Sequence, residues 1–188
     1  MTSARRLDGS TAVRSYCLLL SSLLLSSCGY TTRPGLSSAL RTVYVKPFVN
    51  KIDLTELTTD YQRFPVYRHG LEIEVTKAVI NRFQFTGLLR PAGPSSADAR
   101  LEGELVEFRR DALRYNASQQ VEEWRLSVVV NLRFFDAHSN EPLWEEARFT
   151  GDTTYFALGT NAESEATALD RAVNDVARRI VERTVENW

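Results

Sequence analysis

Few side chains in this sequence have the type and spacing that covalent or metal chemistry requires. The 188 residues include two cysteines, Cys17 and Cys28, and two histidines, His69 and His138. One histidine lies near the start of a helical pattern and the other in a turn, so a shared metal site would need two distant segments to meet. The sequence contains no G-x-S-x-G nucleophile elbow, no P-loop and no dinucleotide fingerprint. We therefore predict no catalytic residue, no metal site, no cofactor and no enzymatic activity.

Arginine side chains offer binding chemistry instead. Arg109, Arg110 and Arg114 cluster on one predicted strand and the turn that follows it. Guanidinium groups match the geometry of phosphate, so this cluster suits recognition of an anionic group. The same residues also suit a solvated sheet face, on which carboxylates of other strands, such as Glu145 and Glu146, are cross-strand partners of arginines. The residues alone leave both interpretations open.

The overall charge argues against a nucleic-acid partner. The 23 Lys and Arg residues nearly balance the 24 Asp and Glu residues, which gives a net charge of −1, whereas nucleic-acid-binding domains are strongly basic. A length of 188 residues with 43% hydrophobic and 25% charged residues is typical of one globular domain with a tail. We expect a single domain that does not bind nucleic acid.

A basic segment and then an apolar segment precede Cys28. Arg5, Arg6 and Arg14 lie before Tyr16–Leu25, which is apolar apart from two serines. This run is shorter than the roughly 20 residues that a membrane-spanning helix needs. It matches the n-region and h-region of a secretory signal peptide.

The residues just before Cys28 refine that prediction. Leu25-Ser26-Ser27-Cys28 resembles the lipobox of bacterial lipoproteins, in which the cysteine thiol takes a diacylglyceryl group and the new amino terminus is acylated. The resemblance implies a signal peptide over residues 1–27 and lipid attachment, with palmitate-type chains, at Cys28. Position 29 is Gly rather than Asp, which by the same resemblance favours the outer membrane. The alternatives are an ordinary signal peptide with a chance cysteine and an uncleaved anchor.

The periodicity of the remaining chain predicts the elements that position these residues. Residues 31–40 form a tether, and strands are expected at 42–48, 88–94, 101–115, 124–135 and 143–150, with a bulge near Leu105 and Val106. A helix is expected over 65–85 and another from a capping box at Thr160 and Glu163. The expected apolar stripes of the two helices are Leu71, Ile73, Val75, Val79, Ile80 and Phe83, and Ala166, Leu169, Val173, Val176 and Ile180.

These elements predict an α+β fold in a single domain. A mixed, mainly antiparallel sheet of about four strands would carry two helices on one face, because both helices have an apolar stripe to bury. Trp124 and Trp144 are expected as half-buried sheet aromatics. The other face of the sheet is polar, so it is either solvated or covered by a partner.

The order of these segments resembles a known family. "CGY" before a tether, "VYVKPF", "LEIEVTKAVINRF", the strand pair "ARLEGELVEFRRDALRYN" and "EEWRLSVVVNLRFFD", and the closing "ALDRAVNDVARRIVERTVENW" are similar to the LptE-type lipopolysaccharide (LPS)-assembly lipoproteins. The resemblance implies a lipidated N-terminus and tether at 28–41 and an LptE-like domain at 42–188.

The same resemblance implies a function. Such lipoproteins sit in the outer membrane, plug and help to assemble the LptD β-barrel, and bind LPS for delivery to the outer leaflet. Arg109, Arg110 and Arg114 would be the LPS-contacting residues, whereas residues 157–161, "ALGTN", lack the basic residue expected before the last helix. The alternative is a periplasm-facing outer-membrane lipoprotein that acts as a scaffold or regulator of cell-wall assembly without binding LPS.

Overall fold

The computed structural model describes residues 40–52, 63–65 and 68–185. The chain divides into the units Met1–Pro34 and Gly35–Trp188, and all described residues belong to the second. The predicted signal peptide at 1–27, Cys28 and most of the 28–41 tether therefore lie outside the described residues.

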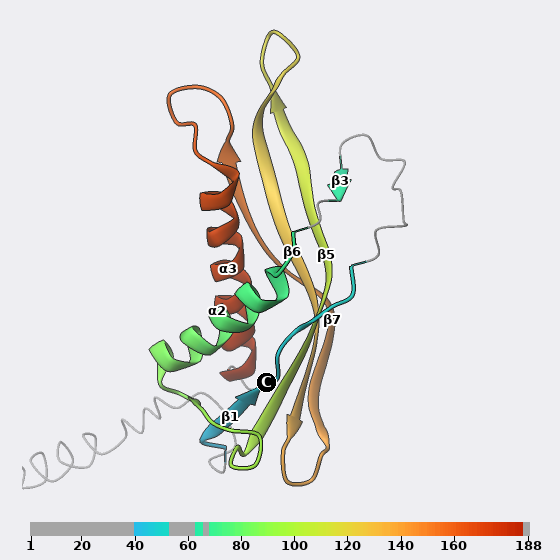
Figure 1. The fold of residues 1–188 in the computed structure, drawn as a ribbon, viewed down its shortest axis with the longest axis vertical. Helices are drawn as coiled ribbons and strands as arrows, with labels where there is room; N and C mark the ends of the chain where they lie inside the picture. Colours follow the sequence, from blue (N-terminus) through green and yellow to red (C-terminus); the bar gives the residue numbers. More distant parts are fainter. Residues whose placement is uncertain (1–39, 53–62, 66–67, 186–188) are drawn as a thin grey trace, which may run out of the picture. The chain divides into compact units, whose positions relative to one another are not determined.

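One mixed sheet and two helices make up the described part of the chain (Figure 1). The sheet has seven strands in the order β4-β1-β5-β6-β7, with β2 and β3 also paired to β5. The elements are β1 (Thr42–Val45), β2 (Val49–Asn50), β3 (Arg63–Pro65), α2 (Leu71–Thr86), β4 (Arg90–Pro91), β5 (Ala99–Tyr115), β6 (Val121–Asp136), β7 (Pro142–Phe156) and α3 (Glu165–Val185). The predicted α+β class is confirmed, but about four strands was an underestimate, because three short segments line one edge of β5 in succession.

Long antiparallel hairpins form the centre of the sheet. β5 pairs with β6 and β6 with β7, whereas β1 runs parallel to both β5 and β4. The alternation of "WRLSVVVNLRFF" predicted β6 correctly, since Leu126, Val128 and Val130 are fully buried. The predicted bulge is also confirmed, because the register shifts between Leu105 and Glu107.

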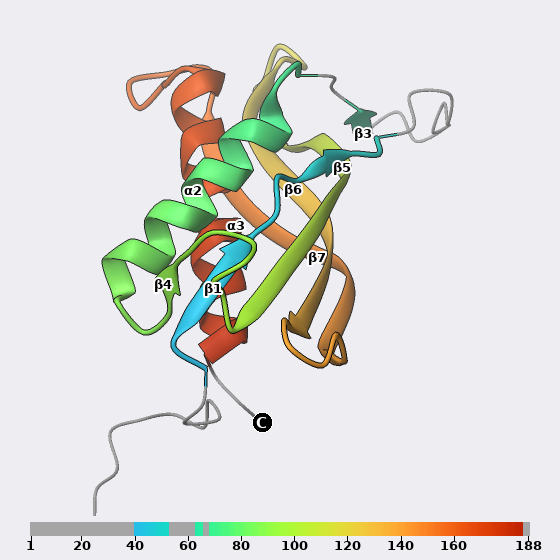
Figure 2. The same ribbon diagram turned by 60° about the horizontal axis from the view of Figure 1, so that its bottom comes forward.

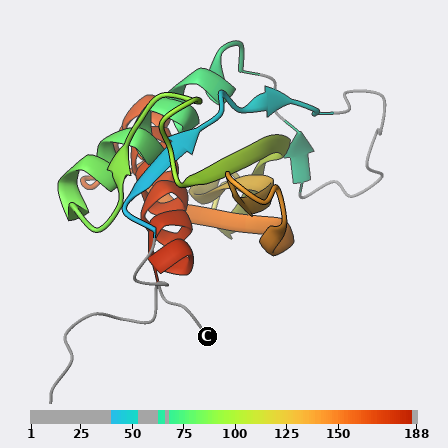
Figure 3. The same cartoon turned by 90° about the horizontal axis from the view of Figure 1, so that it is seen from below.

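Both helices lie on the same side of the sheet (Figures 1 and 2). α2 buries Leu71, Val75, Val79 and Phe83, one residue every four positions, as its sequence predicts. α3 buries a longer stripe that runs from Ala168 to Val185. The core lies between these stripes and the strand residues that face them. Seen from below, α3 lies alongside β7 (Figure 3).

The helix boundaries required corrections. Pro65 belongs to β3 rather than to a helix, and α2 begins only after Gly70, whose φ of 82° lies in the left-handed region. The capping box at Thr160 and Glu163 was wrong: the Ser164 Oγ accepts from the Thr167 N–H at 3.1 Å and caps α3.

Two expected stripe residues also differ from the prediction. Ile73 is 53% exposed on α2, and Ala166 is exposed on α3. Ile73 lies two residues from both Leu71 and Val75, about 200° around the helix, so it cannot share their face.

Glycine sets the spacing between α3 and the sheet. A Cβ built on Gly151 of β7 would lie 2.4 Å from the backbone N of Val176 and 2.5 Å from its Cα. The helix backbone therefore approaches the strand more closely than any side chain at this position would permit.

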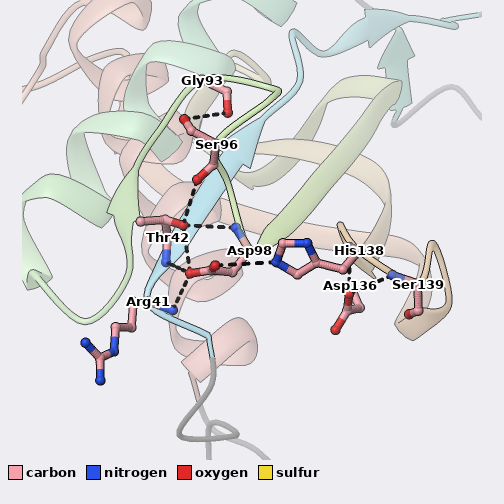
Figure 4. A network of polar contacts seen from close by, with 8 residues as sticks. All are labelled: Arg41, Thr42, Gly93, Ser96, Asp98, Asp136, His138 and Ser139. Carbon is pink, nitrogen blue, oxygen red and sulfur yellow. Dashed lines mark hydrogen bonds and ion pairs between the residues drawn. The ribbon is translucent and has the colours of Figure 1, made fainter.

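A carboxylate joins three segments at the end of the sheet where β1 begins (Figure 4). Asp98 Oδ2 accepts hydrogen bonds from the Arg41 N–H, the Thr42 N–H and the Thr42 hydroxyl, at 2.8–2.9 Å. His138 Nε2, from the β6–β7 turn, lies 3.6 Å from Asp98 Oδ1. The hydrogen bond from the Arg41 N–H, followed by those from the Thr42 hydroxyl and the Thr42 N–H, lowers the pKa of Asp98 from 3.8 to about 2.

Candidate binding surface

The bulge in β5 decides which charged residues share a face of the sheet. Glu104 pairs with Asn131 and Glu107 with Val129, so both point away from the helices although they are three residues apart. A second shift, between Ala112 and Arg114, places Arg114 opposite Glu123 on that same uncovered face. We call this face, with its charged residues on β5 and β6, the open face.

Arg109 lies on the open face between two carboxylates of its own strand. Its Nη1 is 3.1 Å from Glu107 Oε1 and its Nε is 3.1 Å from Asp111 Oδ2. Partial burial alone would raise the pKa of Glu107, but hydrogen bonds from Arg109 and Arg148 outweigh it and hold that pKa below its ordinary value. The guanidinium is thus engaged within the sheet.

Arg110 points to the opposite, helix-covered face. Its Nη1 lies 2.6 Å from Glu165 Oε2 in the first turn of α3, and its guanidinium lies 4.3 Å from the ring centroid of Trp124. The Tyr155 hydroxyl donates to the same Glu165 oxygen at 3.3 Å. Arg110 therefore connects the start of α3 to the sheet.

Arg114 lies near the tip of the β5–β6 hairpin and is the most exposed of the three arginines, at 58%. Its Nη2 is 3.4 Å from Glu123 Oε2, and its guanidinium lies 5.5 Å from the ring centroid of Phe156. The structure thus brings Arg109 and Arg114 to one face, with Asp111 between them, and sends Arg110 to the other. Contact of these residues with LPS stays a prediction.

Exposed apolar side chains accompany Arg114 at this end of the sheet, which we call the hairpin end. Leu113 is 41% exposed, Tyr115 46% and Leu158 39%. The tip of the hairpin and the loop after β7 project at the same end (Figure 1). The hairpin end therefore combines a cation with apolar surface, which suits an amphiphilic ligand. In the sequence, these exposed apolar residues are indicated by "DALRYN", where the alternation of apolar and polar residues along the strand is lost.

The loop before α3 is held by an arginine from the helix itself. Residues 157–161 contain no basic residue, as expected, but Arg171 reaches back with Nη1 2.5 Å and Nη2 2.6 Å from the Glu163 carboxylate. It also donates to the carbonyl of Thr154 at 2.8 Å. These bonds lower the pKa of Glu163 and fix the loop to the edge strand.

Two shallow grooves flank β7, and both are lined by charges of both signs. One, of about 460 Å³, lies between β7 and α3 and is lined by residues that include Glu146, Arg179 and Arg183. The other, of about 470 Å³, lies on the open face and includes Glu102 and Arg133. Neither has the mainly apolar lining of a small-molecule pocket.

The described ranges hold neither a metal-binding cluster nor a membrane-spanning helix. Over residues 40–52, 63–65 and 68–185, no three His, Cys, Asp or Glu side chains gather as a metal site would require. None of the helices in that part of the chain is long and apolar enough to cross a membrane.

Trp124 and Trp144 are partly buried and pack against the core, as predicted.

The fold and this surface define an α+β domain whose polar sheet face and amphipathic hairpin end are left uncovered by its own helices. Residues 40–184 match the family model LptE, described as lipopolysaccharide-assembly. The chain therefore belongs to the LptE lipopolysaccharide-assembly family, which confirms the family predicted from the sequence. No curated protein matches the chain.

Solved structures support the fold. A protein of the family DUF330 from Xanthomonas campestris has a TM-score of 0.50 and 15% identity, with 82% of this chain and 87% of that one covered. A hypothetical protein from Chlamydia trachomatis also has a TM-score of 0.50 and 15% identity, with 78% and 96% covered. At this identity the similarity concerns the fold alone.

Proposed function

We propose that this chain is a non-enzymatic outer-membrane lipoprotein, anchored through Cys28, that plugs an LptD-like β-barrel, assists its assembly and binds LPS on its way to the outer leaflet. The family match over residues 40–184 carries this proposal, because it spans both helices and all strands of the domain. The lipobox-like Leu25–Cys28 segment supports the anchor, and Gly29 supports the outer membrane.

The open face suits the wall of a barrel. The lumen side of a β-barrel is polar, whereas its lipid side is apolar. Glu102 is 3.2 Å from Lys46, 3.1 Å from Arg100 and 3.4 Å from Arg133, so each of these three cations already contacts a carboxylate within the domain. These contacts lower the desolvation cost of placing the three cations against a polar wall.

Affinity purification tests the partner. Tagged protein recovered from detergent-solubilised outer membranes should bring down a large β-barrel protein in stoichiometric amount. Recovery alone, or together with peptidoglycan enzymes, would contradict the proposal and favour the cell-wall scaffold. If the protein were an enzyme, substitution of a single Ser, His or Glu would abolish an activity while partner recovery stayed unchanged.

Lipidation is tested separately. Cys28→Ala should abolish palmitate labelling and release the protein from the outer membrane while leaving its fold intact, because a lipid rather than a core contact is removed. Labelling that persists in Cys28→Ala would exclude the assignment.

LPS binding is tested at the hairpin end. Arg114→Ala should weaken LPS binding roughly fivefold, since one charge-assisted contact to a phosphate contributes about 1 kcal/mol. Arg133→Ala is a matched control, because Arg133 also makes a 3.4 Å ion pair and is 48% exposed, but it lies on β6, at the end of the β5–β6 pair away from the hairpin tip. The effect should shrink at high salt. Equal losses in the two variants would return Arg114 to the solvated-face interpretation.

The other two arginines extend that test. Replacing Arg109, Arg110 and Arg114 together with Ala should weaken binding further, and in a salt-dependent way. Because Arg110 holds α3 to the sheet, the single variants are measured beside the triple one, with the free energy of unfolding as a check on each.

A further inference from the structure

The turn between α2 and β4 exposes apolar side chains that the barrel and LPS roles do not use. Phe85 is 82% exposed and Leu88 is 50% exposed. Large apolar side chains at such exposure, only three positions apart in the chain, are typical of a contact surface. We call Phe85 and Leu88, together with Arg41, Arg82 and Arg90, the turn patch.

Local geometry directs these side chains outward. The buried stripe of α2 ends at Phe83, and Phe85 lies two residues further, about 200° around the helix from that stripe. Gly87 then ends the helix with a φ of 65°, and the chain turns into β4. Leu89 is fully buried while Leu88 points away from the core.

The turn patch adjoins the point where the chain enters the domain. Arg90 pairs with Thr42 in the register of β4 and β1, and the Arg90 N–H donates to the Arg41 carbonyl at 2.9 Å. The end of α2, β4 and the start of β1 lie at the same end of the fold (Figure 2). The patch is therefore close to Leu40, the first described residue.

Three arginines lie at the same end of the fold as the apolar residues. Arg41 and Arg90 are exposed, and the guanidinium of Arg82 lies 5.5 Å from the Phe85 ring centroid. Arg82 also lies 3.9 Å from Glu182, which partly offsets its charge. Aromatic and aliphatic side chains bordered by arginines match the interface of an anionic bilayer, where the apolar groups insert and the cations remain at the headgroups.

Chain length connects this patch to a membrane. Cys28 precedes Leu40 by 12 positions, and a chain of that length spans at most roughly 40 Å. Lipid attachment at Cys28, on which this step rests, would keep this end of the domain within that distance of the bilayer. An exposed apolar patch held so near a membrane has phospholipid as its nearest partner.

We propose that the turn patch docks the domain on an anionic phospholipid surface, with Phe85 and Leu88 inserted at the interface and Arg41, Arg82 and Arg90 at the headgroups. The lipid on Cys28 would supply the anchor, and the patch would set the orientation of the domain on the bilayer. A second, weaker membrane contact on an already anchored chain gains from the high effective concentration that the anchor creates.

The experiment uses the mature chain, residues 28–188, carrying Cys28→Ser, which lacks both the lipid and the apolar run of the predicted signal peptide. Its sedimentation with vesicles of phosphatidylethanolamine and phosphatidylglycerol should be measurable, and Phe85→Ser combined with Leu88→Ser should lower it about tenfold, because both apolar contacts are lost. Ile73→Ser is the matched control: it removes an apolar side chain that is 53% exposed near the other end of the same helix, and should change nothing.

A second pair of variants tests the charges. Arg41→Gln with Arg90→Gln should weaken binding several-fold on these vesicles and not on zwitterionic ones, and the difference should vanish in high salt. No binding by the parent chain, or equal binding by the Phe85 and Leu88 variant, would overturn the proposal. If the Phe85 and Leu88 variant bound vesicles as the parent does but recovered less barrel protein in the affinity purification, the patch would instead be a contact with protein.

Failure here is distinguishable from failure of the proposed function. The vesicle assay uses an unlipidated chain and no barrel, so it does not depend on palmitate labelling or on partner recovery. Both substituted apolar side chains are exposed, so the free energy of unfolding should be unchanged and serves as the folding check.

Discussion

Neighbouring residues on β5 and β6 face two different environments. Leu101, Phe108 and Val128 point toward the helices and are at most 1% exposed. Glu102 and Arg109, next to them in sequence, point to the open face, where their side chains keep 17% and 20% exposure and make ion pairs. The helix-covered face is thus stabilised by packing, and the open face by paired charge.

This difference separates two kinds of sensitivity. Packed apolar groups respond to added or removed volume and hardly to pH or salt. Ion pairs and hydrogen-bonded carboxylates respond to protonation and screening, and they tolerate changes of shape. A domain that presents its charged face to a partner can therefore adjust that face without disturbing its core.

The largest effect is expected where α3 approaches the sheet. Gly151→Ala should lower the free energy of unfolding by about 3 kcal/mol, because the new methyl group would lie 2.4 Å from the Val176 backbone N. Gly93→Ala is the control, since its nearest atom, Ser96 Oγ, is 3.7 Å away. Urea unfolding of the full chain measures both. Similar values for the two variants would mean that α3 is not held at this spacing.

Acid should act on the polar contacts and leave the packing intact. The pKa of Asp98 is about 2 in the folded protein and 3.8 ordinarily. A lowered folded pKa adds stability above about pH 4, and this is lost as the pH falls toward 2. The midpoint temperature of thermal unfolding should therefore fall as the pH is lowered across that window.

Asp98→Asn sharpens the acid test. The amide keeps one acceptor oxygen but no charge, so stability at neutral pH should fall and the decline between pH 4 and pH 2 should become smaller. Asp170→Asn, an exposed carboxylate on α3, is the control and should retain the parent profile. An unchanged decline in Asp98→Asn would assign the acid sensitivity to other carboxylates.

The sequence predicted the covered face better than the open one. Alternation in β6 and four-residue spacing in α2 report directly on burial, so the core around Val128 and Val79 followed from pattern alone. The buried face of a helix was predicted less well where an apolar residue such as Ile73 lies outside the stripe. Hydrophobicity alone does not say toward which side of the helix a side chain points.

The arginines show why the surface was harder to predict. Arg109 and Arg110 adjoin in sequence and face opposite ways, which strand geometry dictates, but the face of Arg114 depends on a register shift after Ala112. The pairing of β1 with β5 joins residues 56 positions apart, as in the Thr42–Asp98 contact, and no local pattern encodes it. β2 and β3 have two and three residues, too few for periodicity to indicate a strand.

The smallest effects are expected from individual ion pairs on the open face. A double-mutant cycle with Glu107→Gln and Arg109→Gln should give a coupling of about 1 kcal/mol, because both side chains are at least 74% buried and 3.1 Å apart. The matched cycle, Glu102→Gln with Arg133→Gln, should give about 0.5 kcal/mol or less, since Arg133 is 48% exposed and the contact is 3.4 Å.

Salt distinguishes the two cycles further. Raising the ionic strength to about 1 M shortens the screening length to roughly 3 Å, which should remove most of the Glu102–Arg133 coupling and less of the Glu107–Arg109 coupling. If the Glu102–Arg133 and Glu107–Arg109 couplings were equal to each other at low and at high ionic strength, solvent would reach both pairs alike. The centre of the open face would then be no more shielded from solvent than its end. A protected centre would instead keep its charges paired when a polar partner surface replaces water, because Glu107 already receives hydrogen bonds from Arg109 and Arg148.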